Sequence, residues 1–321
     1  MHREPSLAEA DLTQLANLCV NCRGCYYACQ YTAPHELDVN LPKALAEVRR
    51  ESWEEFAWPQ ALAKAFHTKA YGLVLALILG TAVLFSLAKY LGDLAGSGFY
   101  DVMSHTLMVS LFLPAFLFPA LSLFISMRRY WKHVGGEKVK MSHLKSALAD
   151  AAKMKDLAAG HGQGCNFEDE DRFSQARRHA HHAIMYGFLL CLASTTSGTV
   201  LHYLFNQPAP YGFVSIPKLL GVPGGILLTI GCVMMIGLKL KSDKSLGDSQ
   251  AWNSDIIFTA LLGFVAFSGL ALWAFGQTPA VSYLLITHLG AVLAFFIITP
   301  FSKMAHGFYR LAAMIREAQN K

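Results

Sequence analysis

The chain has 321 residues, of which 54% are hydrophobic and only 15% are charged, and its formal net charge is +5. This composition is too apolar and too weakly charged for an ordinary soluble domain, so most of the chain belongs in a bilayer. The positive charge does not indicate nucleic-acid binding, because the placement of Lys and Arg around membrane spans accounts for it.

Residues 1–40 contain four of the seven cysteines, in the spacing C-x2-C-x2-C-x3-C: Cys19, Cys22, Cys25 and Cys29. This spacing is that of bacterial ferredoxins, in which cysteine thiolates bind a [4Fe–4S] cluster. Zinc sites usually pair two C-x2-C units across a longer spacer, so an iron–sulfur cluster fits the pattern better. No apolar signal segment precedes the cysteines, which predicts a reducing compartment where disulfides are disfavoured.

The fourth cysteine of this motif ligates a second cluster in ferredoxins, and the chain contains no second quartet. Cys191 and Cys232 lie inside predicted spans, where a thiol mostly packs as a small apolar group. Cys165 is the remaining cysteine, in a polar loop. Two arrangements stay open: Cys165 completes a cluster begun by the first three cysteines, or a second quartet lies upstream of the present start or on a partner subunit.

Residues 41–70 form the predicted link to the membrane. Within residues 35–58 the pattern favours an amphipathic helix that ends at an aromatic interface anchor, Trp53 and Trp58, and a plain linker fits equally well.

Six apolar stretches are long enough to span a bilayer. The predicted fold is therefore all-α: a six-helix transmembrane bundle over residues 71–305, with a small N-terminal ferredoxin-like iron–sulfur segment, a cytoplasmic loop at 128–181 and a C-terminal tail at 306–321. The predicted spans are Tyr71–Ala88, Val102–Met127, Ala183–Phe205, Leu219–Leu238, Ile256–Phe275 and Val281–Pro300.

The distribution of positive charge predicts the orientation of these spans. Of the 27 Lys and Arg residues, 25 fall at the termini or in the loops on the same side as the termini, and only Lys89 and Lys218 fall on the other side. Because positive residues are retained in cytoplasmic loops, we expect both termini to be cytoplasmic in a bacterial inner membrane.

Histidines in or beside the spans are the candidate haem ligands, because ionisable groups inside a bilayer are costly and usually functional. In the predicted topology, His182 and His306 lie at the cytoplasmic face, and His202 and His288 lie toward the far face. Each pair has one histidine on the third span and one on or just past the sixth, so its two imidazoles can hold a b-type haem between the two helices. Two such pairs suit two stacked haems. His105 also lies at the far face and is the reserve ligand there.

Helical geometry favours this pairing more on the sixth span than on the third. His288 and His306 are 18 residues, or five turns, apart, so they share one face of a regular helix. On the third span His202 lies nearly opposite His182 but within about 60° of His181. A helix bend at the sequence STTSG would accommodate the difference.

The sequence contains no substrate-transforming motif: it lacks a nucleophile motif, a G-x-G-x-x-G before a strand and paired carboxylates in a span. The stretch GVPGG at Gly221–Gly225 favours close helix packing or a helix start over a phosphate-binding loop.

Three long stretches resemble the tricarballylate utilisation protein B family, also called citrate utilisation protein B, and the similarity runs nearly end to end. They are LANLCVNCRGCYYACQYTAPHELDVNLPKALAEVR, HHAIMYGFLLCLASTTSGTVLHY and HLGAVLAFFIITPFSKMAHGFYR. The resemblance implies a membrane iron–sulfur and haem protein that reoxidises the reduced flavin of tricarballylate dehydrogenase and passes electrons to the quinone pool. It also implies ligand roles for all four cysteines of the motif. The family typically carries an earlier cysteine quartet, so we expect the natural start to lie upstream.

The expected mechanism is a chain of single-electron transfers from flavin to cluster, to the two haems and to quinone. A flavoprotein is expected to dock on the cytoplasmic face, steered by Arg23, Lys43, Arg49, Arg50 and the basic 128–178 loop. Two other functions fit the sequence. One is a cytochrome b-type subunit of an anaerobic respiratory reductase that takes electrons from quinol. The other is a transporter with a regulatory iron–sulfur domain, in which the histidines relay protons.

Overall fold

The computed structural model describes residues 7–91, 104–158, 167–169 and 172–321 of the chain. The fold is all-α, as predicted, apart from one short antiparallel pairing of β1 (Phe167–Asp169) with β2 (Arg172–Phe173). The helices in chain order are α1 (Glu9–Leu18), α2 (Gly24–Tyr27), α3 (Leu41–Phe56), α4 (Gln60–Leu91), α6 (His105–His133), α7 (Met141–Lys153), η1 (Lys155–Leu157), α8 (Ala176–Phe205), α9 (Ile216–Lys241), η2 (Lys244–Leu246), α10 (Ser249–Phe275), α11 (Val281–Ile298), η3 (Thr299–Phe301) and α12 (Ala305–Gln319).

The six predicted spans are confirmed as helices. They coincide with α4, α6, α8, α9, α10 and α11, except that the second begins in residues outside the described chain and the sixth runs two residues past α11. Six helices of the described chain are long and apolar enough to cross a bilayer. Most of their residues are not buried inside the protein, which is what a helix facing lipid requires. The chain is therefore a membrane protein.

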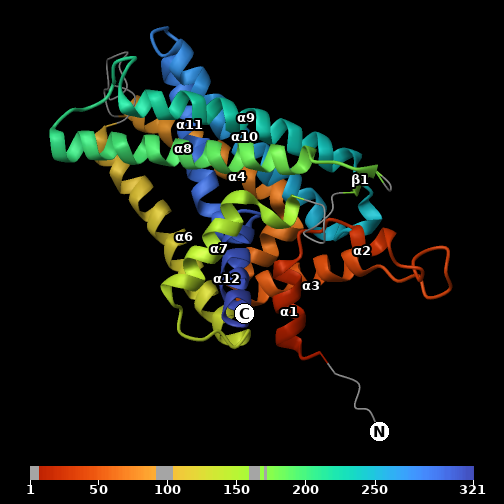
Figure 1. Cartoon of the computed structure of the whole chain (residues 1–321). Helices are drawn as coiled ribbons and strands as arrows, with labels where there is room; N and C mark the ends of the chain where they lie inside the picture. The colour runs from red at the N-terminus through yellow and green to blue at the C-terminus, as the bar shows by residue number, and fades with distance from the viewer. Residues whose placement is uncertain (1–6, 92–103, 159–166, 170–171) are drawn as a thin grey trace.

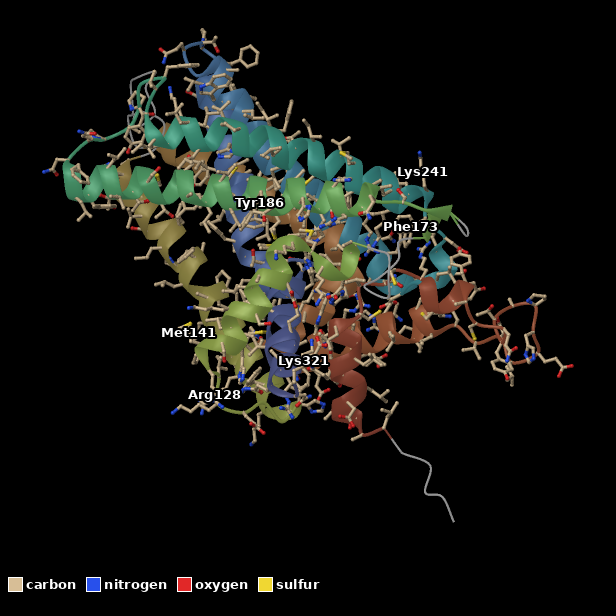
Figure 2. All side chains as sticks on the ribbon, viewed as in Figure 1. Arg128, Met141, Phe173, Tyr186, Lys241 and Lys321 are labelled. Carbon is tan, nitrogen blue, oxygen red and sulfur yellow. The ribbon has the colours of Figure 1, made fainter. Side chains whose placement is uncertain are left out.

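The two ends of the bundle differ in what they carry. The C-terminus and the helices α1, α3, α7 and α12 lie at one end of the bundle (Figure 1). The α8–α9 and α10–α11 connections lie toward the opposite end. Arg128 and Lys321 lie on the side of the C-terminus, and Lys241 lies at the end of α9 that is away from the α8–α9 connection (Figure 2). These three cations are therefore placed away from the end that carries the α8–α9 connection.

Helices α8 and α9 run side by side (Figure 1) and approach each other at glycines. A Cβ atom added to Gly187 would lie 2.6 Å from the amide nitrogen of Leu228, and one added to Gly231 would lie 2.8 Å from the amide nitrogen of Ile184. Only glycine permits such a close backbone approach, which is typical of membrane helix pairs. Gly224 packs on α8 in the same way, so the stretch GVPGG serves helix packing.

Helix α3 confirms the predicted helix but not the predicted membrane anchor. Trp53 is buried: its Nε1 donates to Asn17 Oδ1 at 2.8 Å and its ring stacks on Tyr309 with centroids 5.9 Å apart. The prediction that it anchors the chain in the interface is wrong, because the indole is used to pack α3 between α1 and α12. Trp58 is half-buried and lies against Phe118.

The sixth span does not continue as a regular helix to His306. α11 ends at Ile298, and α12 begins at Ala305 after a short 3-10 turn that contains Pro300. Proline has no amide hydrogen and clashes with the preceding turn, so it interrupts an α-helix. His288 and His306 therefore do not share one face of a single helix, which corrects the prediction from their spacing.

Enlarging the packing glycines should separate α8 from α9. We expect the double variant Gly224→Ala/Gly231→Ala to destabilise the protein by about 1–3 kcal/mol, because each added methyl group overlaps backbone atoms of α8. The loss is measured as a lower thermal unfolding midpoint in detergent. Gly237→Ala, in the same helix, is the control because a Cβ atom added there would meet open space. Equal midpoints for both variants would contradict the packing.

Candidate functional site

The cysteine loop, defined here as residues 18–29, follows directly on α1. Cys19 caps that helix, and the chain then turns through Asn21 and Arg23, whose φ angles are 53° and 66°. The Asn21 amide donates to Cys19 Sγ at 3.3 Å, and the Tyr31 amide donates to Cys29 Sγ at 3.4 Å. Backbone amides that donate to cysteine sulfurs are typical of loops that hold an iron–sulfur cluster.

The first three thiols of the motif lie close enough to influence one another. Burial, followed by the neighbouring Cys19 and Cys22 sulfurs, raises the pKa of the Cys25 thiol. Thiolates that repel one another in this way are stabilised together only by a bound cationic group, which also removes their protons. Among the described residues, no three Cys, His, Asp or Glu side chains lie near enough to hold a single metal ion. The all-thiolate donor set fits an iron–sulfur cluster, which spaces its ligands more widely than one ion does.

Three arginines lie around Cys19. Arg177 Nη1 donates to the Asn21 carbonyl at 3.0 Å, and Arg310 Nη1 donates to the Leu18 carbonyl. Arg49 is the third: its Nε and Nη2 atoms are buried and have no hydrogen-bond partner in the part of the chain that the structure describes.

Burial lowers the pKa of the Arg49 guanidinium, while the Cys19 sulfur acts in the opposite direction. A buried cation is costly unless an anion compensates it. A cluster held by cysteine thiolates brings negative charge to this position, so the orphaned donors of Arg49 fit an iron–sulfur cluster at the cysteine loop.

A pair of histidines lies beside this loop. The rings of His181 on α8 and His306 on α12 meet edge to face, with centroids 5.7 Å apart. His306 Nδ1 hydrogen-bonds the Lys303 carbonyl. A carbonyl only accepts, so Nδ1 carries the hydrogen and Nε2 keeps the lone pair that a metal ligand needs. His181 Nδ1 is buried without a hydrogen-bond partner among the described residues.

A second histidine pair lies at the opposite end of α8. The rings of His202 and His105 are parallel, at an interplanar angle of 7° and a centroid distance of 4.8 Å. The Tyr203 hydroxyl lies 3.2 Å from His105 Nε2. His181 and His202 are 21 residues apart on one continuous helix, so the two pairs are separated by about 31 Å along its axis.

The structure does not bring the ring of His182, the predicted partner of His306, to the His306 ring. The ring of His182 lies instead against Tyr186, at 5.8 Å. The helix continues through STTSG with its threonine hydroxyls bonded to carbonyls four residues earlier. At about 100° per residue, His181 lies on the same side of α8 as His202, and His182 does not.

The structure does not bring His288, the predicted partner of His202 on the far side, to the His202 ring either. His288 packs between α11 and α10, where its Nδ1 lies 3.0 Å from Ser268 Oγ, and His202 is paired with His105. Cys165, the other predicted thiol ligand, lies outside the described residues. The ligand role of each histidine and cysteine stays a prediction.

The residues expected to steer a partner are mostly engaged within the protein. Arg23 is buried and donates to the Asp243 carbonyl at 2.9 Å. Arg50 forms ion pairs with Glu54 and Asp248 at 2.9 and 2.6 Å. The Nε and Nη2 atoms of Arg49 are buried, so Lys43 alone of these four residues is exposed, whereas the 128–178 loop also presents exposed lysines such as Lys138 and Lys140.

The structural roles of Arg177 and Arg310 were not predicted from the sequence. The signal was present as spacing: Arg177 precedes His181 by four residues, and Arg310 follows His306 by four residues. Residues four apart share a helix face, so Arg177 lies beside His181 and Arg310 lies beside His306. Both arginines reach the cysteine loop.

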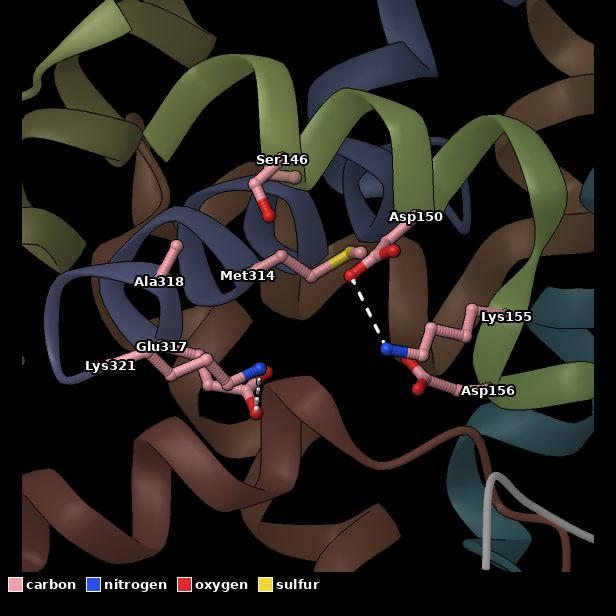
Figure 3. Close-up of a pocket in the computed structure, with 9 residues that line it drawn as sticks. Ser146, Asp150, Lys155, Asp156, Met314, Glu317, Ala318 and Lys321 are labelled. Carbon is pink, nitrogen blue, oxygen red and sulfur yellow. Dashed lines mark ion pairs between the residues drawn. The ribbon is translucent and has the colours of Figure 1, made fainter. Parts of the chain in front are cut away.

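A pocket of about 240 Å³ lies elsewhere, between α7, η1 and α12 (Figure 3). Its charges neutralise one another: Lys155 pairs with Asp150 at 3.9 Å, and Lys321 pairs with Glu317 at 3.2 Å. It holds no cysteine or histidine. We therefore place the candidate site at the cysteine loop and not in this pocket.

Two family models match the chain. The model described as Citrate utilization protein B matches residues 92–321, and the model described as Citrate utilization protein B Fer4-like domain matches residues 1–55. The chain is 37% identical over 327 residues to Citrate utilization protein B of Escherichia coli, and the alignment covers 100% of this chain and 86% of that relative. No solved structure matches. The Fer4-like match covers the cysteine loop and supports an iron–sulfur cluster there.

Replacing a cysteine of the loop should remove the cluster. We expect Cys22→Ser to lose most of the iron and acid-labile sulfide of the purified protein, because a hydroxyl is a harder and weaker ligand for iron–sulfur clusters than a thiolate. Cys191→Ser, on α8, is the control and should retain both. Iron and sulfide at the wild-type level in Cys22→Ser would exclude this residue as a ligand.

Proposed function

Since the chain belongs to the citrate utilization protein B family, we propose that it is a membrane electron-transfer protein that reoxidises a reduced flavoprotein dehydrogenase and passes the electrons to the quinone pool. The proposed partner is an enzyme of the tricarballylate dehydrogenase type. The chain itself transforms no organic acid in this proposal, in keeping with its lack of a substrate-transforming motif.

The observation that carries the proposal is the order of the candidate ligand groups. The cysteine loop lies beside the His181–His306 pair at one end of the bundle, and α8 leads from there to the His105–His202 pair at the other end. Iron–sulfur clusters and haems, when bound, accept and release single electrons. Ligand groups placed in this order suit transfer from a soluble donor to an acceptor in the membrane.

We assign Cys19, Cys22 and Cys25 to a [4Fe–4S] cluster, because their spacing is that of a ferredoxin motif and the Fer4-like match covers them. The fourth ligand is Cys29 or Cys165. Cys29 has the support of the Tyr31 amide, which donates to its sulfur.

We assign haem b to the two histidine pairs, with His181 and His306 as one ligand set and His105 and His202 as the other. The tautomer of His306 is the strongest support, since its Nδ1 is held by a carbonyl and its Nε2 is left for a metal. His288 has a ring nitrogen beside the Ser268 hydroxyl and is the alternative ligand on the far side.

We place both termini on the cytoplasmic side of a bacterial inner membrane. The end of the bundle that carries α1 and the C-terminus also carries the cysteine loop, which follows α1, and the cations Arg128 and Lys321 (Figure 2). A flavoprotein with an acidic face would dock at this end through Lys43 and the basic 128–178 region. The quinone would then accept electrons at the opposite end of the bundle.

The cofactor content of purified variants tests this proposal. The wild-type protein should show b-type haem bands in a dithionite-minus-air spectrum, together with iron and acid-labile sulfide. His181→Ala and His306→Ala should each lower the haem content per chain, because each removes one imidazole of the same pair.

His182→Ala is the matched control, since the change is the same and the residue is adjacent on α8. Its haem content should equal that of the wild type. Equal haem in His181→Ala and wild type would refute this ligand assignment. A wild-type protein without haem would refute the electron-transfer proposal itself and favour a transporter.

A further inference from the structure

The two helices that carry the cytoplasmic-end histidine pair also hold the cysteine loop. On α8, Arg177 lies one turn from His181, and on α12, Arg310 lies one turn from His306. The imidazoles meet each other, whereas both guanidiniums reach the backbone of the loop. Each helix thus contributes one histidine and one arginine to the same small region.

The two arginine contacts lie on either side of the first cysteine. Arg310 donates to the carbonyl of Leu18, immediately before Cys19, and Arg177 donates to the carbonyl of Asn21 at 3.0 Å, two residues after it. The turn at Asn21 has a positive φ, which is uncommon for a residue with a side chain. A guanidinium on its carbonyl helps to hold that conformation.

The arginine on α12 is itself held in place. Its Nη2 donates to Asp156 Oδ2 in η1, so Arg310 is fixed from the side opposite to the loop. Gln14 Nε2 donates to the Ala313 carbonyl at 2.7 Å, which fastens α1 to the same helix. The loop is consequently tied to α12 by Arg310 and to α8 by Arg177, and the helix that precedes it is tied to α12 by Gln14.

We propose that Arg177 and Arg310 are positioning residues that hold the cysteine loop at a fixed distance from the His181–His306 pair and place positive charge beside Cys19. We call these two residues the arginine clamp. The effect of the clamp on potential and electron-transfer rate rests on the proposed function. Its mechanical part, the holding of the loop in place, concerns the polypeptide chain alone.

The clamp has two separable effects. Its geometry sets the separation of the cysteine loop from the histidine pair, on which the rate of electron transfer between groups bound there depends steeply. Its charge stabilises the more negative, reduced state of a group bound by the thiolates and raises its midpoint potential. Lysine preserves the charge but lacks the planar fork that lets Arg310 bind a carbonyl and a carboxylate at once.

The mechanical part is tested on metal-free full-length protein in detergent, by amide hydrogen exchange over residues 18–29. Arg177→Gln and Arg310→Gln should each speed exchange of these amides by at least about tenfold. The controls are Arg178→Gln on α8 and Arg316→Gln on α12. These arginines also donate to carbonyls, of Lys153 at 2.9 Å and of Val134 at 3.2 Å, but not to the loop.

Exchange in the two clamp variants that matches the two controls would overturn the clamp. This readout needs neither cluster nor haem, so it decides the clamp even if the wild-type protein lacks haem and the proposed function fails.

The redox part is tested on protein loaded with both cofactors. Arg310→Gln should lower the midpoint potential of the cluster and slow haem reduction through it by between about tenfold and a hundredfold, as expected for a displacement near 1 Å. Arg310→Lys should restore the potential but not the rate. A rate of haem reduction within about twofold of wild type in both Arg310 variants, with an unshifted midpoint potential in Arg310→Gln, would overturn the positioning role.

Discussion

The structure depends on the compensation of buried charge at one end of an apolar bundle. Asp255 at the start of α10 accepts from Lys239 of α9 at 2.6 Å and from Lys303 at 2.9 Å, in the link between α11 and α12. The Lys303 ammonium also lies over the Trp53 ring, and its carbonyl holds His306. Removing the carboxylate would leave two cations without their partner at a cost of about 3–5 kcal/mol. The ion pair with Asp255 thus helps to hold Lys303, and the Lys303 carbonyl in turn holds the His306 ring.

The same network makes the cysteine segment and the C-terminal helix parts of one site. Trp53 connects α1 to α12 by its bond to Asn17 and its stacking on Tyr309, and the arginine clamp connects both to α8. Residues 306–321 are therefore not an independent tail, since α12 supplies a histidine, an arginine and an aromatic ring to the region around the cysteine loop. These contacts explain how α1 and α12, from opposite ends of the described chain, are brought together at the cysteine loop.

Much of the fold was predictable from the sequence, because six long apolar stretches allow few structures in a bilayer. The cysteine spacing likewise predicted the iron–sulfur segment. The histidine pairs were not predictable in detail. Pro300 breaks the helix that the spacing of His288 and His306 assumed, and the choice of His181 over His182 depends on how α8 is rotated against α12. Such rotation is set by packing at Gly187 and other close contacts, and the spacing of residues along the sequence does not reveal these contacts.

The most direct test of the account is the rate at which reduced flavin reduces the haem of the purified, cofactor-loaded protein under anaerobic conditions. The wild type should show haem reduction in a stopped-flow optical experiment. Cys22→Ser, with its haem content confirmed, should reduce its haem at least about tenfold more slowly. Without a cluster at the cysteine loop, electrons from the flavin must travel farther to reach the haem. Haem reduction at the same rate in Cys22→Ser and wild type would contradict the claim that electrons enter through this loop.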